Sequence, residues 1–215
     1  MREFLKTHKH YYALLLVPLY FICFFAIEEI IVDDYYVCYL PFLDDLIPFC
    51  EWFAIPYVLW YPYMVAVGVT LLIYDSKEFM RFIILLMGSM HLCLVICAFF
   101  PNGQNLRPET FARDNVLTRL MATLYAADTN TNVLPSMHVI GSLATNAGVW
   151  RSKHKILRNP YIKSASLVLC ILICLATCFV KQHSALDGIA ALILFVPLYL
   201  LIYKYDLLFR KKKNS

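Results

Sequence analysis

Charged residues are scarce in this chain of 215 residues, because Asp, Glu, Lys and Arg together make up 16% of it. An average soluble domain holds about 25%. Glycine is scarce as well, with six residues, which excludes a collagen-like chain. By contrast, 61% of the residues are hydrophobic and the mean hydropathy is +0.64. This composition excludes a disordered chain and an ordinary soluble enzyme, and it indicates an integral membrane protein.

The eight cysteines form no CxxC pair, so the sequence lacks the usual spacing of a zinc site. Cys38 and Cys50 lie in a polar-flanked segment, where both free thiols and a disulfide are compatible with the sequence. Five others lie in apolar runs at spacings of four and are expected to pack as small apolar side chains. These five are Cys93, Cys97, Cys170, Cys174 and Cys178.

Six apolar runs predict membrane-spanning helices, each of which needs about 20 apolar residues. The connecting segments are too short for a separate soluble domain, so we predict one all-α membrane domain over residues 1–215, with six transmembrane helices in a bundle. The first run follows a basic start but is too long for a signal peptide, and we expect it to stay as a helix. The runs cover approximately 11–32, 52–74, 79–100, 133–150, 164–180 and 183–203.

Two longer connecting segments are expected at one end of these helices. Residues 33–51 are aromatic and acidic and are interrupted by prolines, so an interfacial hairpin and a short re-entrant segment are both compatible with them. Residues 101–132 form a polar stretch, whose last part is expected to cap the fourth helix.

The basic residues are distributed unevenly over this topology. Of the 19 Lys and Arg residues, all but Arg107, Arg113, Arg119 and Lys181 fall on the side that holds both termini. Cytoplasmic loops are enriched in Lys and Arg, so we predict a multi-pass protein of the cell membrane with both termini in the cytoplasm. The basic segments are expected to contact anionic membrane lipids. They do not gather on one face of the chain, which argues against a nucleic-acid partner.

Polar residues of three distant segments are predicted to meet at the outer membrane face. His183 and Asp187 are four residues apart and share one helix face, where the carboxylate can orient the imidazole ring. His138 lies at the same depth, and Arg107 can bind phosphate oxygens in a bidentate way. The helix start at Ser136 presents backbone N–H groups to an anion. This set predicts a phosphate-handling site, and an interfacial ion pair of His183 with Asp187 is the alternative.

Three segments together resemble the motifs of the type 2 phosphatidic acid phosphatase superfamily, which includes lipid phosphate phosphatases and vanadium haloperoxidases. They are Asn102-Gly-Gln-Asn-Leu-Arg-Pro108, Pro135-Ser-Met-His138 and Lys181-Gln-His-Ser-Ala-Leu-Asp187, so the resemblance covers residues 102–187. Related branches are the inositol phosphorylceramide and sphingomyelin synthases, which transfer a phospho-headgroup. The resemblance implies six helices, an active site at one membrane face, and a reaction that needs no metal or other cofactor.

The resemblance also implies a role for each matched residue. His183 is the nucleophile that forms a phosphohistidine, Asp187 orients its ring, and His138 is the general acid that protonates the leaving alkoxide. Arg107 and Ser136 bind the phosphate.

Two positions that are basic in the family hold other residues in this chain. Phe100 stands at the place of a Lys, and Thr177 at the place of an Arg. Lys181 can supply one lost charge if it lies in a turn rather than in regular helix, because residues two apart do not share a helix face. Asn105 is an uncharged candidate for binding phosphate.

The predicted function is an integral-membrane phosphatase that hydrolyses a lipid phosphomonoester or diphosphate through a phosphohistidine intermediate. A phosphohistidine also reacts with alcohols, so a phosphotransferase similar to inositol phosphorylceramide synthase is the alternative. A non-catalytic lipid-binding relative is a third reading, supported by the two missing basic residues. The predicted partners are a lipid phosphate substrate and membrane lipids.

Overall fold

The structure is a computed structural model and describes residues 9–30 and 35–206. Within these residues, five helical stretches are long and apolar enough to cross a membrane. The first, His10–Glu29, joins the 3-10 helix η1 (Lys9–Leu15) to α2 (Leu16–Ile30), and the second, Glu51–Tyr74, joins η2 (Glu51–Phe53) to α4 (Ala54–Tyr74). The other three are α5 (Ser76–Phe99), α9 (Pro160–Phe179) and Ala185–Lys204, which joins α10 (Ala185–Tyr199) to the π-helix η3 (Leu200–Lys204).

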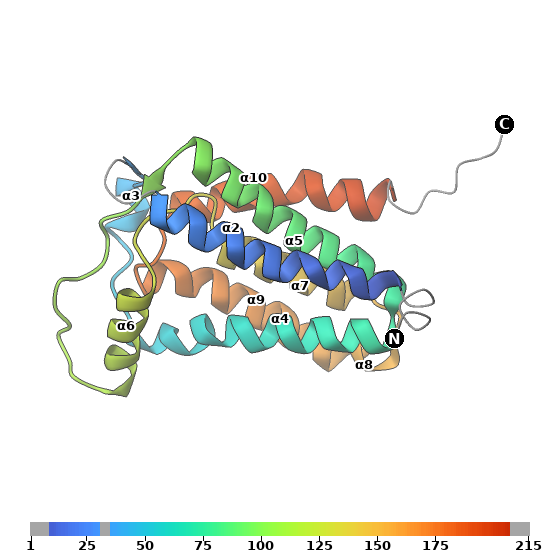
Figure 1. The fold of residues 1–215 in the computed structure, drawn as a ribbon. Helices are drawn as coiled ribbons and strands as arrows, with labels where there is room; N and C mark the ends of the chain where they lie inside the picture. The colour runs from blue at the N-terminus through green and yellow to red at the C-terminus, as the bar shows by residue number, and fades with distance from the viewer. Residues whose placement is uncertain (1–8, 31–34, 207–215) are drawn as a thin grey trace.

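The fourth predicted span forms α7 (Met137–Arg151), a helix of 15 residues. It is shorter than the length of about 20 residues that a membrane span needs. It packs against α4, α5, α9 and α10 and lies between the long helices in Figure 1. Most of its residues are buried by protein, which explains why this run is the least hydrophobic of the six. The sixth membrane span therefore stays a prediction.

Small residues on α7 let large aromatic side chains of its neighbours approach closely. A Cβ atom at Gly141 would lie 2.9 Å from the ring of Trp60 on α4, and one at Gly148 would lie 3.1 Å from the ring of Phe82 on α5. Trp60 and Phe82 are both buried. The packing of α4 and α5 onto the central helix thus depends on the absence of side chains at these two positions.

The connecting segments contain more regular secondary structure than the sequence predicts. In the expected hairpin or re-entrant segment, β1 (Tyr36–Val37) pairs in parallel with β2 (Asn102–Gly103), and α3 (Pro41–Asp44) follows; residues 31–34 lie outside the described part. Cys38 and Cys50 are both free thiols.

The polar stretch 101–132 contains a helix that the sequence analysis missed, α6 (Val116–Ala127). Asn115 and Thr118 form a capping box at its start, and its apolar face, which includes the buried Met121, packs in one cluster with Tyr57 and Val180. The β1–β2 pair, α3 and α6 gather at one end of the long helices, whereas α8 (Lys155–Arg158) lies at the other end (Figure 1).

We predict that Gly141→Ala destabilises the protein, because the new methyl group collides with a ring that other side chains hold in place. Overpacking of this kind typically costs about 1–3 kcal/mol. The midpoint of thermal unfolding in detergent should therefore fall by roughly 2–10 °C. Gly88→Ala is the matched control, because nothing lies within 4 Å of a Cβ atom at that helical glycine. An equal shift in both variants would contradict the proposed close packing.

Candidate active site

A sharp turn between α9 and α10 places His183 at the start of the last long helix. Lys181 adopts a left-handed conformation with a φ of 53°. The backbone N–H groups of Gln182 and His183 both donate to the carbonyl oxygen of Thr177, each at 3.0 Å. The turn that the sequence analysis required around Lys181 is therefore present, and it directs His183 toward the interior of the protein.

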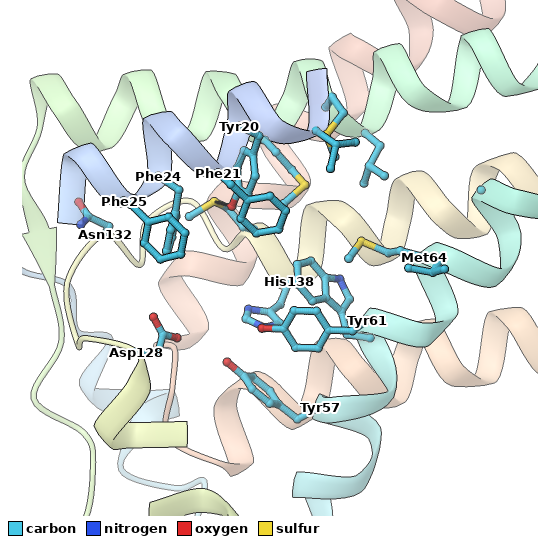
Figure 2. Close-up of a pocket in the computed structure, with 18 of the residues that line it drawn as sticks. Tyr20, Phe21, Phe24, Phe25, Tyr57, Tyr61, Met64, Asp128, Asn132 and His138 are labelled. Atoms are coloured by element: carbon cyan, nitrogen blue, oxygen red, sulfur yellow. Dashed lines mark hydrogen bonds between the residues drawn. The ribbon is translucent and has the colours of Figure 1, made fainter. Parts of the chain in front are cut away.

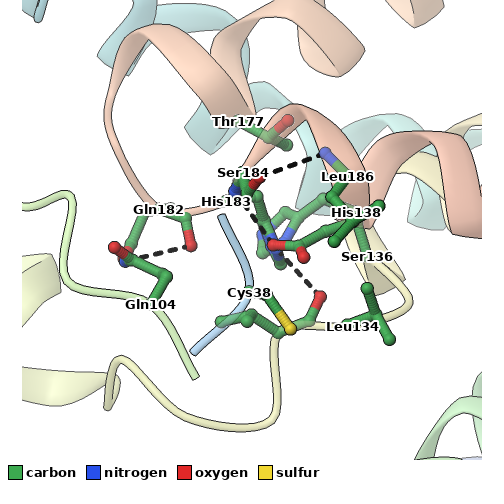
Figure 3. A network of polar contacts seen from close by, with 12 residues as sticks. Cys38, Gln104, Leu134, Ser136, His138, Thr177, Gln182, His183, Ser184 and Leu186 are labelled. Carbon is green, nitrogen blue, oxygen red and sulfur yellow. Dashed lines mark hydrogen bonds and ion pairs between the residues drawn. The ribbon is translucent and has the colours of Figure 1, made fainter. Parts of the chain in front are cut away.

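The ring of His183 is held at one nitrogen and open at the other. Its Nδ1 lies 3.2 Å from Oδ2 of Asp187 and 3.1 Å from the carbonyl oxygen of Val133. Two acceptors at this distance favour a proton on Nδ1, so a neutral ring keeps its lone pair on Nε2. Nε2 lies 3.4 Å from Nδ1 of His138 (Figure 3).

Asp187 links the two histidine-bearing segments. Its side chain is fully buried, and Oδ2 also accepts a hydrogen bond of 2.9 Å from the backbone N–H of Ser184. Its carbonyl oxygen accepts from the backbone N–H of Ser136 at 3.1 Å. The start of α10 is therefore bonded directly to the residue that caps α7, and the three predicted residues His138, His183 and Asp187 come together.

His138 lies in the first turn of α7, directly after Ser136. The hydroxyl of Ser136 is fully buried and caps the helix at the N–H of Val139 (3.4 Å). The imidazole lies against the rings of Tyr57 and Trp60, with centroids 4.4 and 4.3 Å away. Its Nε2 is buried and has no hydrogen-bond partner within the described residues. This atom is therefore free to exchange a proton with a bound molecule.

The guanidinium of Arg107 is hydrogen-bonded to protein acceptors rather than presented as a free cation. Its guanidinium donates to the carbonyl oxygens of Tyr125 (3.1 Å), Asp128 (2.9 Å) and Thr129 (2.5 Å), and to Oε1 of Gln182 (2.5 Å). Burial lowers the pKa of this group from its usual value. Arg107 thus fastens the loop after α6 to the residue that precedes the predicted nucleophile.

The other predicted phosphate ligands are also bonded to protein groups. Nζ of Lys181 donates to the carbonyl oxygen of Asp44 at 2.9 Å. Asn105 is exposed, and its Oδ1 accepts from the hydroxyl of Tyr35 at 3.1 Å and from Nδ2 of Asn130 at 3.3 Å. Within the described residues, the structure shows no contact of Asn105 with either histidine.

Asp44 on α3 is a site residue that the sequence analysis missed. Its buried carboxylate accepts from the hydroxyl of Ser184 (2.5 Å) and from the backbone N–H groups of Ala185 (2.8 Å) and Leu40 (2.7 Å). A negative charge at this place is stabilised by the N-terminal end of α10. No local pattern reveals this role, because Asp44 and Ser184 are 140 residues apart.

A cavity of about 560 Å³ opens beside the two histidines. Its apolar part is lined mainly by aromatic and aliphatic side chains of α2, α4 and α5, and its polar end by the two histidines and six further residues. Figure 2 shows the carboxylate of Asp128 directed into this pocket. The six polar residues are Glu28, Asp128, Thr129, Thr131, Asn132 and Gln182.

No family model, curated protein or solved structure matches the chain in the comparisons. Over residues 9–30 and 35–206, no group of three or more His, Cys, Asp or Glu side chains is arranged to hold a metal ion. The two histidines, the buried carboxylate of Asp187 and the adjoining cavity are the features of this region that can support chemistry.

We predict that Asp44→Ala destabilises the start of α10. The substitution leaves the hydroxyl of Ser184 and the N–H of Ala185 without their buried acceptor, which costs roughly 1–3 kcal/mol for each unsatisfied group. A decrease in the midpoint of thermal unfolding in detergent would show this. Asp45→Ala is the control, since Asp45 is the neighbouring carboxylate and is exposed. If Asp45→Ala had the larger effect, the cap assigned to Asp44 would be wrong.

Proposed function

We propose that the chain is a polytopic membrane enzyme that cleaves a phosphate ester of a lipid through a phosphohistidine on His183. The observation that carries this proposal is the state of the His183 ring, with Nδ1 between two acceptors and Nε2 beside His138. An interfacial ion pair would not need a second buried histidine with an unpartnered nitrogen at the mouth of a lipid-sized cavity.

In the first step, the lone pair on Nε2 of His183 attacks phosphorus, and the bond between phosphorus and the lipid oxygen breaks. His138 gives its proton to the leaving alkoxide, and Asp187 stabilises the positive charge that develops on His183. In the second step, His138 removes the proton of an incoming hydroxyl group. That hydroxyl attacks phosphorus, and the bond between nitrogen and phosphorus breaks.

Water and an alcohol are both suitable acceptors in this scheme. With water the enzyme is the phosphatase that the sequence predicts, acting on a lipid phosphomonoester or diphosphate. With an alcohol it is the alternative phosphotransferase, acting on a phosphodiester.

The charges of the site favour the second candidate, the phosphotransferase. Phe100 and Thr177 replace two of the family's cations, and both Arg107 and Lys181 donate to protein acceptors. A phosphodiester carries one negative charge and needs fewer cations than a phosphomonoester dianion.

We predict different defects for the two histidines. His183→Ala should abolish turnover with every ester, because no nucleophile remains. His138→Ala should slow cleavage of a lipid ester by about 10²–10⁴-fold, the usual contribution of a general acid. This defect should shrink with a nitrophenyl ester of the same phosphate, whose leaving group needs no proton.

The measurement is the rate of release of the lipid alcohol or of nitrophenol by the purified protein. His154→Ala is the control, because that histidine lies in the connector before α8, at the opposite end of the long helices. Rescue of His183→Ala, rather than His138→Ala, by the activated ester would reverse the two roles. Full activity of both variants would show that neither histidine carries the cleavage, whereas no release by the unaltered protein would leave the non-catalytic lipid-binding reading.

We also propose that α7 is a sixth span, that both termini are cytoplasmic and that the site lies at the outer face of the cell membrane. The uneven distribution of Lys and Arg supports this orientation. A Glu109→Cys variant without native cysteines should react with an impermeant maleimide in intact cells, because Glu109 is exposed in the polar stretch at the site's end. Lys155→Cys in α8 should react only after permeabilisation, and the opposite pattern would place the site in the cytoplasm.

A further inference from the structure

We propose that the substrate is a zwitterionic phospholipid, whose positively charged ammonium headgroup binds between Asp128, Glu28 and the aromatic rings at the polar end of the cavity. This inference rests on the proposed function, and it names the class of lipid on which the phosphohistidine chemistry acts. Four features of the described cavity lining support it: its charge, the state of its two carboxylates, its rings, and its unpartnered polar atoms.

The charge of the lining is negative. Apart from the two histidines and the tyrosines, its ionisable side chains are Glu28 and Asp128, and neither Lys nor Arg belongs to the described lining. A phosphomonoester dianion would add two negative charges to this end of the cavity. A zwitterionic lipid adds no net charge and brings a cation to the two carboxylates.

The two carboxylates differ in their surroundings. Both oxygens of Glu28 accept protein hydrogen bonds, from the hydroxyl of Thr129 (2.5 Å) and from Nδ2 of Asn132 (2.6 Å). The carboxylate of Asp128 accepts no hydrogen bond from the described residues and points into the pocket (Figure 2). Burial, and then the nearby Glu28, raise the pKa of Asp128 from its usual value. A bound cation would offset both effects.

Aromatic rings line the pocket into which this carboxylate points. Phe24 and Phe25 lie at its end of the pocket, and Tyr57 and Tyr61 border it from α4 (Figure 2). The faces of aromatic rings attract ammonium groups, and a set of rings combined with a carboxylate is a common way to bind a quaternary ammonium ion. The same rings would gain little from an inositol or glycerol headgroup, which carries no charge.

Buried polar atoms without partners complete the pattern. Nε2 of His138 and Nε2 of Gln182 are unpartnered, their side chains line the cavity, and the two residues are 8% and 3% exposed. Both nitrogens can donate to phosphate oxygens. Hydrogen-bond donors and acidic groups therefore line the same polar end of the cavity. A phosphate with an attached ammonium group offers a partner to each.

The reaction follows the two steps of the proposed mechanism, and each bond that forms is matched by a bond that breaks. Nε2 of His183 attacks phosphorus, the bond from phosphorus to the glycerol oxygen breaks, and diacylglycerol leaves with the proton of His138. The headgroup phosphate stays on His183. A hydroxyl group of water or of an alcohol then attacks phosphorus and gives its proton to His138. The bond between nitrogen and phosphorus breaks, which releases the headgroup as a phosphomonoester or as a new phosphodiester.

The test compares the release of diacylglycerol from four lipids with identical acyl chains, with and without added glycerol as acceptor. The purified full-length protein is reconstituted in vesicles that contain phosphatidylcholine, phosphatidylethanolamine, phosphatidylglycerol or phosphatidate at equal mole fraction. We expect at least one of the two zwitterionic lipids to be cleaved at least ten times faster than phosphatidylglycerol, which has the same phosphodiester but an uncharged headgroup.

Asp128→Asn should reduce this preference about tenfold, and a midpoint of thermal unfolding in detergent close to that of the unaltered protein would show that the variant folds. The matched control is Asp114→Asn, since Asp114 is an exposed carboxylate that pairs with Arg119 away from the cavity. Equal rates for the zwitterionic lipids and phosphatidylglycerol, or a preference that Asp128→Asn does not alter, would overturn the headgroup inference. If His183-dependent cleavage persisted, the proposed function would stand. Release from none of the four lipids would overturn both.

Discussion

The hydrogen bond between Nδ1 of His183 and the buried carboxylate of Asp187 is the interaction on which the rest of the site depends. Asp187 also accepts from the backbone of Ser184, and its carbonyl oxygen accepts from Ser136. A buried carboxylate is tolerated only when such partners are in place. The same residue therefore orients the ring of His183, completes the capping box at the start of α10 and holds α10 against the start of α7.

Local geometry explains what the sequence could predict. The spacing of four between His183 and Asp187 indicates their contact because it follows from one helical turn. The capping box of Asn115 and Thr118 and the apolar spacing after it were present in the sequence and could have indicated α6. Asp44 could not be recognised in this way, since its bonds to Ser184 and Ala185 depend on how α3 folds back onto α10.

The sequence patterns also could not show how the cations are used. Arg107 and Lys181 have the residue types that bind phosphate, yet both donate to backbone carbonyl oxygens in the structure. The carbonyl oxygens come from the ends of α6 and α3, whose positions no motif describes. A match of residue type therefore identified the segments that meet, but not the atoms that face the cavity. The sequence also could not show that α7 is buried by protein, because hydropathy alone does not distinguish a helix surrounded by lipid from one surrounded by protein.

The two histidines and the two carboxylates of the cavity belong to different parts of the chain. The histidines belong to α7 and to the turn before α10, whereas Glu28 belongs to α2 and Asp128 to the end of α6. Arg107 joins the two parts, because it bonds to the backbone of Asp128 and to the side chain of Gln182 next to His183. Exchange of the Asp128 side chain leaves these backbone bonds intact. Under the proposed function, the charge at this end of the cavity can therefore change without disturbing the position of His183.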